Sequence, residues 1–447
     1  MAAPTRRAVL RGAIAAAGLA VGGMTVAALG GCGLLRQGNG GPSTTTLTLV
    51  GESGNPLLSD APDLMPVGRA LAAGYNSAAG AAARIVARVS GTGLTAYMQG
   101  LLRGSPPFPS DLMFTTPGVR DLRDASAMML DLTAALQETG LAAGIYPMVL
   151  AYCAPGGQQR MIPIFRDPLV VYYNADAFSR AGADPPAPDW TAAALLQLCG
   201  QLLTHFRGTV VPLANVVNVF DLEVLSAFVQ GYGGEMLTRS AGPGAHGYVP
   251  RFAEPAAIQG IDALLRLHAF EAARPSVSPL ALFARGTAAM YFGHHRDIAP
   301  LHAQIAGLFS WGVAPLPRFP ARAVQPVRAD GIAAVTRNPK HMQAAIAVAL
   351  YGATPAGQLE AARTGVGVPA LRALAQSPVW RQGAPYLDND VFVAQPEADI
   401  IVHPALEYVA PQLETAVRAV LAGAPVVTTF REASTAVEFT LQTWPNV

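Results

Sequence analysis

IPIFRDPLVVYYNADAFSRAGADPPAPDW, residues 162–190, is the stretch from which the architecture of this chain can first be read. Its segment 169–173 is rich in β-branched and aromatic residues and predicts a buried strand. The proline-rich segment 184–189 predicts a rigid turn. Thr191 then stands where a helix cap is expected, with the helix continuing to about Phe206. A strand followed by a helix in this way indicates an α/β fold.

The same alternation extends in both directions along the chain. Before this stretch we expect strands at 47–50, 84–89 and 111–114, with helices at 64–75 and 94–103. After it we expect strands at 209–213, 248–252, 287–292, 311–313 and 331–335, and helices at 222–230, 256–270, 341–351, 404–421 and 430–442. Such alternation predicts mostly parallel sheets, whose ligands bind beyond the carboxyl ends of the strands.

The bulk composition limits the class of function. The chain has 447 residues, of which 51% are hydrophobic and 13% charged, so a large core is expected rather than disorder. The formal net charge of +1 provides no basic surplus for binding nucleic acid. Three cysteines are too few for a disulfide scaffold. Cys153 and Cys199 could pair outside the cytoplasm, but we interpret them as two separate thiols.

The N-terminus resembles an export signal. Arg6 and Arg7 form a twin-arginine pattern, an Ala- and Gly-rich apolar stretch follows at 13–31, and this ends in Leu-Gly-Gly before Cys32. That ending resembles the lipobox of bacterial lipoproteins, so Cys32 is the expected site of lipidation, and residues 33–46 form a flexible tether. The alternative is a transmembrane anchor, which the high Gly and Ala content disfavours.

Several motifs in order along the chain resemble those of one family. They are VYYNADAF (171–178), the later Ala181-Gly182, Pro185-Pro186 and Trp190, then FARGTAAM (283–290), GVAPLP (312–317) and GVGVP (365–369). These resemble motifs of the extracytoplasmic solute-binding proteins of bacterial ABC importers, in their carbohydrate-type cluster.

The resemblance implies a two-lobed clamp of the periplasmic-binding-protein kind. Each lobe would be a mostly parallel sheet flanked by helices, with the ligand in a cleft between the lobes. We expect the first lobe at 45–165 and 325–375, the second at 166–324, and a helical tail at 376–447. The protein would act as a monomer outside the cytoplasm, anchored to the membrane by its lipid. Its partners would be a small-molecule ligand and the ABC permease subunits, and it would need no cofactor.

Polar and aromatic residues at matching positions are the candidate ligand contacts. In the first lobe and at the crossing they are Glu52, Ser53, Ser90, Thr92, Thr115, Thr116, Arg166, Asp167, Asp330 and Gly331. In the second lobe they are Asn218, Phe220, Asp221, His294 and His295. Alternatives stay open: Arg166 and Asp167 could form a surface ion pair, and Asp221 could be only a helix cap. Adjacent histidines on an extended chain point apart, so no shared metal is expected.

Motifs of catalysis are missing from the sequence. It contains no G-x-S-x-G, H-E-x-x-H or C-x-x-C, and GPGAHG (242–247) fits the dinucleotide pattern without the strand and helix that such a site requires. A glycoside-acting enzyme, which needs two placed carboxylates, remains an alternative. The chain has four tryptophans, which are few for a protein that binds a long glycan against aromatic side chains. The candidate ligand contacts include several acids but only one arginine, Arg166. We therefore expect the ligand to be a neutral or amino-bearing saccharide or polyol, with a glycerol phosphate or its diester as the alternative.

Overall fold

The structure is a computed structural model of the whole chain. It describes residues 45–51, 65–78, 81, 83–90, 94–106, 109–115, 128–154, 157–214, 216–240, 248–271, 277–381, 390–394 and 396–442. Residues 1–44, including Cys32, therefore lie outside the described residues. Among the described residues, no helix combines the length and the apolar character that a membrane crossing requires.

The described chain divides into two compact units. The first comprises described residues between 45 and 117, between 128 and 166, and between 329 and 393. The second comprises those from 167 to 328 and from 394 to 442. Two of the boundaries fall inside long strands, β4 (Ile162–Asn174) and β10 (Gln325–Ala334). A third falls between Val393 and Ala394, at the end of α17 (Asp390–Val393), so the described chain passes between the units at three places.

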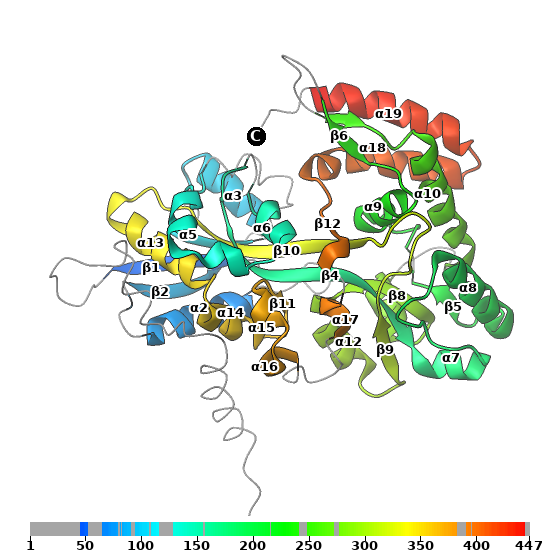
Figure 1. Ribbon diagram of the computed structural model, residues 1–447, viewed down its shortest axis with the longest axis horizontal. Coiled ribbons are helices and arrows are strands. Elements are labelled where there is room, and N and C mark those ends of the chain that lie inside the picture. The colour runs from blue at the N-terminus through cyan, green and yellow to red at the C-terminus, as the bar shows by residue number, and fades with distance from the viewer. Residues whose placement is uncertain are drawn as a thin grey trace, which may run out of the picture. The chain divides into compact units, whose positions relative to one another are not determined.

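The first unit is a sheet with helices (Figure 1). Its other strands are β1 (Thr46–Gly51), β2 (Arg84–Val89), β3 (Leu112–Thr115) and β11 (Val368–Pro369). Its helices are α2 (Met65–Ser77), α3 (Leu94–Leu102), α5 (Thr133–Thr139), α6 (Pro147–Tyr152), α13 (Pro339–Tyr351), α14 (Pro355–Ala362), α15 (Arg372–Ala375), α16 (Pro378–Arg381) and α17 (Asp390–Val393), with a 3-10 turn at Leu141–Gly144. β1 pairs in parallel with both β2 and β3, as expected, whereas β10 pairs antiparallel with β3.

The second unit contains the stretch that the sequence analysis started from. Its other strands are β5 (Val211–Leu213), β6 (Leu237–Arg239), β7 (Tyr248–Pro250), β8 (Ala288–His294), β9 (Trp311–Ala314) and β12 (Asp399–Ile400). Its helices are α7 (Ala175–Ala181), α8 (Ala192–Phe206), α9 (Leu222–Gly231), α10 (Pro255–Leu265), α11 (Pro279–Ala284), α12 (Ile298–Ile305), α18 (Pro404–Leu421) and α19 (Val426–Gln442), with 3-10 turns at Arg266–Phe270, His295–Asp297 and Pro396–Ala398. The pairing here is mixed: β8 runs parallel to β5 but antiparallel to β4.

Local capping explains why the expected helices form where they do. Asn174 accepts a hydrogen bond from the Ala177 amide at the start of α7, and Gly182 ends that helix with a φ of 62°. Thr191 accepts from the Ala194 amide at the start of α8, which confirms it as the cap. The Trp190 indole donates to the Pro315 carbonyl at 2.9 Å. Two of the motifs, VYYNADAF with its tryptophan and GVAPLP, are thus parts of one packed structure.

The core of the second unit includes the two C-terminal helices. α18 and α19 lie side by side (Figure 1). The buried Phe430 of α19 meets Phe252 in an edge-to-face contact with ring centroids 6.4 Å apart. Of the tail expected over 376–447, α16 and α17 belong to the first unit, and α18 and α19 to the second. Cys153 and Cys199 are both buried and form no disulfide, which confirms their interpretation as separate thiols.

Gly260 on α10 shows how closely helices approach in this core. A Cβ at Gly260 would lie 2.5 Å from the Phe228 carbonyl oxygen and 2.7 Å from the Val229 Cα of α9. We expect Gly260→Ala to lower the free energy of unfolding by ~1–3 kcal/mol, because the rigid backbone of α9 must move. The matched control is Gly200→Ala in α8, where nothing lies within 4 Å of the added Cβ. This change should raise stability by ~0.5–1 kcal/mol. Urea unfolding of the three proteins measures both effects, and a neutral or stabilising Gly260→Ala would contradict the packing.

Candidate functional site

Four of the expected contact residues cannot be placed. Glu52, Ser53, Thr92 and Thr116 lie outside the described residues. The remaining candidates fall into the two units, and each unit is considered by itself.

In the first unit, the candidates are buried in the sheet. Ser90 is 2% exposed, and Thr115, Arg166 and Asp330 are completely buried. The Arg166 guanidinium lies over the Tyr146 ring, 5.3 Å from its centroid, and donates to the Phe392 carbonyl. The surface ion pair considered for Arg166 and Asp167 is therefore wrong, because neither side chain reaches the surface.

Gly331 has a packing role that the sequence did not reveal. It pairs with Thr115 of β3, and a Cβ there would lie 2.7 Å from the Ile162 carbonyl oxygen of β4. Gly331 was expected as a ligand contact, and in the structure its backbone closely approaches the neighbouring strand.

In the second unit, a buried ionic network surrounds His294 at the end of β8. The His294 Nε2 lies 2.9 Å from the Glu223 carboxylate, and its Nδ1 lies 3.1 Å from the Asp167 carbonyl oxygen. Glu223 also binds Arg328, with Nη2 and Oε2 2.7 Å apart. Asp167 in turn pairs with Arg296. Sequence reasoning singled out Asp167 and His294 but missed their partners.

The network shifts the pKa values of its members in opposite directions. Burial alone would raise the pKa of Glu223, but Arg328 and His294 hold it well below the usual range. Burial also opposes the charged form of Asp167. Arg296 and His294 nevertheless lower the pKa of Asp167. Burial disfavours a charged His294, yet Glu223 and Asp167 raise its pKa above the ordinary value. The pairs therefore favour the charged forms despite their burial.

His295 also lies close to the network. It is 4% exposed, begins the 3-10 turn His295–Asp297 and helps to lower the pKa of Asp167. Within the described part of the chain, no group of three potential metal-ligating side chains gathers around one point.

Asp221 caps α9, which was the alternative to a ligand contact in the sequence analysis. Its carboxylate accepts from the amides of Glu223 and Val224 at 2.8 and 3.1 Å. Burial raises the pKa of Asp221, and neighbouring Glu223 acts in the same direction. Asp221 remains partly exposed, so capping does not use all of its accepting capacity.

The loop before Asp221 follows the carboxyl end of β5. Its course is held by the buried Glu271 carboxylate, which accepts from the amides of Val217 and Asn218 at 2.6 and 3.0 Å. Asn218 and Phe220 are both partly exposed, and Phe220 packs against the core of the unit. This rigidly held loop therefore offers an amide and an aromatic side chain beside the acid.

The start of α18 adds a second acid that sequence reasoning did not include. Glu407 lies in the first turn of α18 and interacts electrostatically with Arg328 and Glu223. Burial raises the pKa of Glu407 to about 8, although Arg328 acts in the opposite direction. One turn earlier, His403 caps the helix by accepting from the Ala405 amide, and burial lowers the pKa of His403 to about 4.

Asp221, Arg328 and Glu407 thus gather around Glu223 on three elements of the second unit, and we call them the acidic rim. Arg328 has 38% of its side chain exposed. The rim can accept hydrogen bonds through carboxylates and donate them through a guanidinium, which suits hydroxyl and amino groups. It contains no activated nucleophile of the kind that covalent catalysis requires.

The sequence model of the family described as bacterial extracellular solute-binding protein matches residues 103–385, more than half of the chain. The chain belongs to that family. A comparison with curated proteins gives no match.

Solved structures show the same fold at low sequence identity. The cyclic α-maltosyl-1,6-maltose binding protein of Arthrobacter globiformis aligns with a TM-score of 0.72 and 16% identity, over 90% of this chain and 100% of that one. The ABC substrate-binding protein Lmo0181 of Listeria monocytogenes, in complex with cycloalternan, gives 0.71 and 15%, over 89% and 99%. An ABC transporter solute-binding protein of Thermotoga lettingae, bound with α-D-tagatose, gives 0.64 and 18%, over 89% and 100%. The two-lobed periplasmic-binding-protein fold expected from the sequence is confirmed.

The His294 network predicts a specific dependence of stability on pH. The folded protein raises the pKa of His294. The charged imidazole therefore contributes its full stabilisation at pH values below the ordinary pKa of histidine, and this stabilisation is lost as the pH rises through the raised pKa. We expect His294→Gln to lower the free energy of unfolding by ~1–3 kcal/mol at about pH 6, and by less at about pH 9. His205→Gln, on an exposed face of α8, is the control and should change little at either pH. An equal loss for His294→Gln at both pH values would contradict the charged state of His294.

Proposed function

We propose that this chain captures a small polar solute, specifically a saccharide, amino sugar or polyol, and delivers it to an ATP-driven importer. Membership of the extracellular solute-binding family carries the proposal. The fold supports it, because the three structures compared above are described as binding a cyclic maltosyl-maltose, cycloalternan and tagatose. A binding role without catalysis also agrees with the chemistry of the acidic rim.

The proposed mechanism is capture by closure of two lobes that β4 and β10 connect. A ligand shifts such a protein toward the closed form only by binding that form more tightly than the open form. The closed, liganded form would then be recognised by permease subunits. Neither a cofactor nor a metal is needed for this step.

We propose that the ligand contacts the acidic rim together with Asn218 and Phe220. The aromatic face of Phe220 suits the apolar face of a sugar ring, while carboxylate, amide and guanidinium groups suit its hydroxyls. The buried Asp167 and His294 of the second unit would position this surface, and Arg166 of the first unit remains a proposed contributor to the ligand site. Ser90, Thr115, His295, Asp330 and Gly331 remain proposed contributors to the ligand site, as do the undescribed Glu52, Ser53, Thr92 and Thr116.

The charge of the rim favours a neutral or amino-bearing ligand over a phosphate ester. The structure adds Arg296 and Arg328 to the arginines that the sequence analysis considered, but each pairs with a buried carboxylate. Asp221 also lies near Arg328, whereas Glu407, with a pKa of about 8, is mostly a neutral acid at pH 7 that can both donate and accept a hydrogen bond. A phosphate placed there would meet carboxylates, whereas hydroxyl and ammonium groups would donate hydrogen bonds to them.

A panel of ligands tests this proposal directly. Thermal-shift measurements with sugars, amino sugars, polyols and glycerol phosphates should give stabilisation by at least one neutral or amino-bearing compound. A ligand present at one hundred times its dissociation constant stabilises by ~2.7 kcal/mol, and hence raises Tm by a few degrees. Sub-millimolar binding of glycerol-3-phosphate or its choline diester, with none of the neutral or amino sugars, would contradict the proposed ligand class.

Asp221→Asn tests the rim with little change to the fold, because asparagine also caps helices well. We expect calorimetry to show at least about tenfold weaker binding of the best ligand, since one charge-assisted hydrogen bond is lost. The control is Glu414→Gln, an exposed acid of α18 that pairs only with Arg418 in the described structure. Unchanged affinity in Asp221→Asn would remove Asp221 from the site.

We also propose that the mature protein is held at the outer face of the membrane by a lipid on Cys32. The twin-arginine pattern and the lipobox-like ending before Cys32 support this, as does the extracellular family.

Cys32→Ser removes the thiol that would carry the lipid. We expect the variant to move from the membrane fraction to the soluble fraction after export, as seen by fractionation and immunoblotting. Cys153→Ser, which changes a buried thiol, is the control and should fractionate like the parent protein. Identical fractionation of Cys32→Ser and the parent would show that Cys32 is not the anchor.

A further inference from the structure

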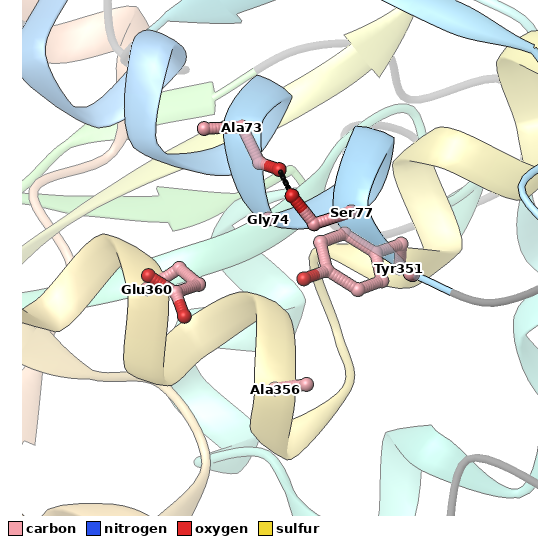
Figure 2. Close-up of a pocket in the computed structure, with 7 residues that line it drawn as sticks. Ala73, Gly74, Ser77, Tyr351, Ala356 and Glu360 are labelled. Carbon is pink, nitrogen blue, oxygen red and sulfur yellow. Dashed lines mark hydrogen bonds between the residues drawn. The ribbon is translucent and has the colours of Figure 1, made fainter. Parts of the chain in front are cut away.

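A hollow of about 510 Å³ opens in the first unit, and none of the residues that line it is assigned to solute binding above (Figure 2). One wall is a row of small residues on α2, including Gly74 and Ser77. The other wall consists of Tyr351 at the end of α13 and of Ala356 and Glu360 on α14. The hollow is within the size range of small-molecule sites in proteins.

Gly74 has a reason to lie in the middle of α2, where glycine is normally unfavourable. A Cβ at Gly74 would lie 2.7 Å from the Tyr351 hydroxyl and 2.8 Å from the Glu360 Cγ. The absence of a side chain therefore leaves room for both groups beneath the helix. Figure 2 shows the Tyr351 hydroxyl directed toward Glu360 on this side of the hollow.

Of the polar groups of the lining, Ser77 and Glu360 accept hydrogen bonds, while the Tyr351 hydroxyl can donate one. The Ser77 hydroxyl already donates to the Ala73 carbonyl at 2.8 Å, so toward the hollow it can only accept. Glu360 is a carboxylate and offers no donor. The aromatic ring of Tyr351 presents a face of negative potential, which attracts cations. Burial together with the nearby Glu360 raises the pKa of Tyr351 to about 12, so the ring remains a neutral phenol.

Glu360 already binds one guanidinium. Arg363 lies one turn further along α14 with its Nη1 2.6 Å from Glu360 Oε1. Both side chains are about one-third exposed, with 37% for Arg363 and 35% for Glu360. A surface pair of this kind contributes little, so an incoming cation can share or replace it.

We infer that this hollow is a second binding site, separate from the solute site, which takes an ammonium or guanidinium group between the Tyr351 ring and the Glu360 carboxylate. The cation would belong either to a free organic amine or to a basic side chain of a partner protein. The head group is the same in both cases, and the walls of small residues leave space for an aliphatic stem beside it.

Calorimetry on the full mature protein with agmatine, a butyl chain with a guanidinium at one end and an ammonium at the other, tests the inference. N-butylurea is the neutral control, since it keeps the planar head and the butyl chain and lacks both charges. We expect agmatine to bind and butylurea not to bind, with agmatine affinity falling about tenfold or more in Glu360→Gln. Arg363→Ala should strengthen agmatine binding, because it removes the internal competitor.

Two variants separate this site from other acids of the protein. Glu414→Gln breaks a comparable exposed pair on α18, and Asp221→Asn removes a charge from the acidic rim. Glu414→Gln should leave agmatine binding unchanged, and Asp221→Asn should leave intact the agmatine binding that Glu360→Gln weakens. Loss of binding in Asp221→Asn but not in Glu360→Gln would place the cation at the rim and overturn the inference. Equal binding of agmatine and butylurea, or no binding of agmatine, would overturn it as well.

A second ligand distinguishes the two possible sources of the cation. Nα-acetyl-arginine amide carries the same head on a blocked backbone, as a partner's side chain would. Tighter binding of this compound than of agmatine supports a partner's side chain, while the reverse order supports a free amine. In each case Glu360→Gln should weaken the binding.

Discussion

The contact between Glu223 and its two cationic partners is the interaction on which the second unit depends. Arg328 is the last residue of that unit on β10, and Asp167 is its first residue on β4. Glu223 binds Arg328 directly and reaches Asp167 through His294. The two strands that leave the unit are therefore tied together by one chain of charged groups. Any rotation between the units would have to act on strands that are held at these residues.

Burying so many charges is unfavourable unless every member has a partner. Asp167 has Arg296, Glu223 has two cations, and the imidazole of His294 binds on both of its nitrogens. Removal of one member leaves another buried charge without compensation, which makes such a network sensitive to substitution. It also makes the network rigid, because few alternative pairings satisfy all members. A rigid base of this kind can hold Asp221 and Glu407 in fixed positions at the rim, and precise placement of polar groups is what selective binding of a hydroxylated solute requires.

The sequence was sufficient for the element order and the class of fold. Strands and helices of this chain have strong apolar periodicity, and Thr191 and Asp221 cap the helices before which they stand. These signals are local, since a cap bonds amides two or three residues away. Element ends were less well predicted where tertiary contacts extend them: the strand expected at 169–173 is only the C-terminal part of β4, which pairs with β8, β9 and β11. The mixed pairing of the second unit was likewise not visible, because strand direction depends on connections made through space.

What the sequence by itself determined is the membership of a two-lobed solute-binding fold, through motifs whose residues act on near neighbours. Only the tertiary structure decided which polar residues meet. Glu223, Arg328 and Glu407 lie far apart in the sequence, and none is marked by a motif, yet folding brings them around one point. Conversely, Arg166 and Thr115 look like surface groups in the sequence and are fully buried. The physical reason is that exposure and charge pairing depend on the packing of distant segments, whereas periodicity and capping depend on residues a few positions apart.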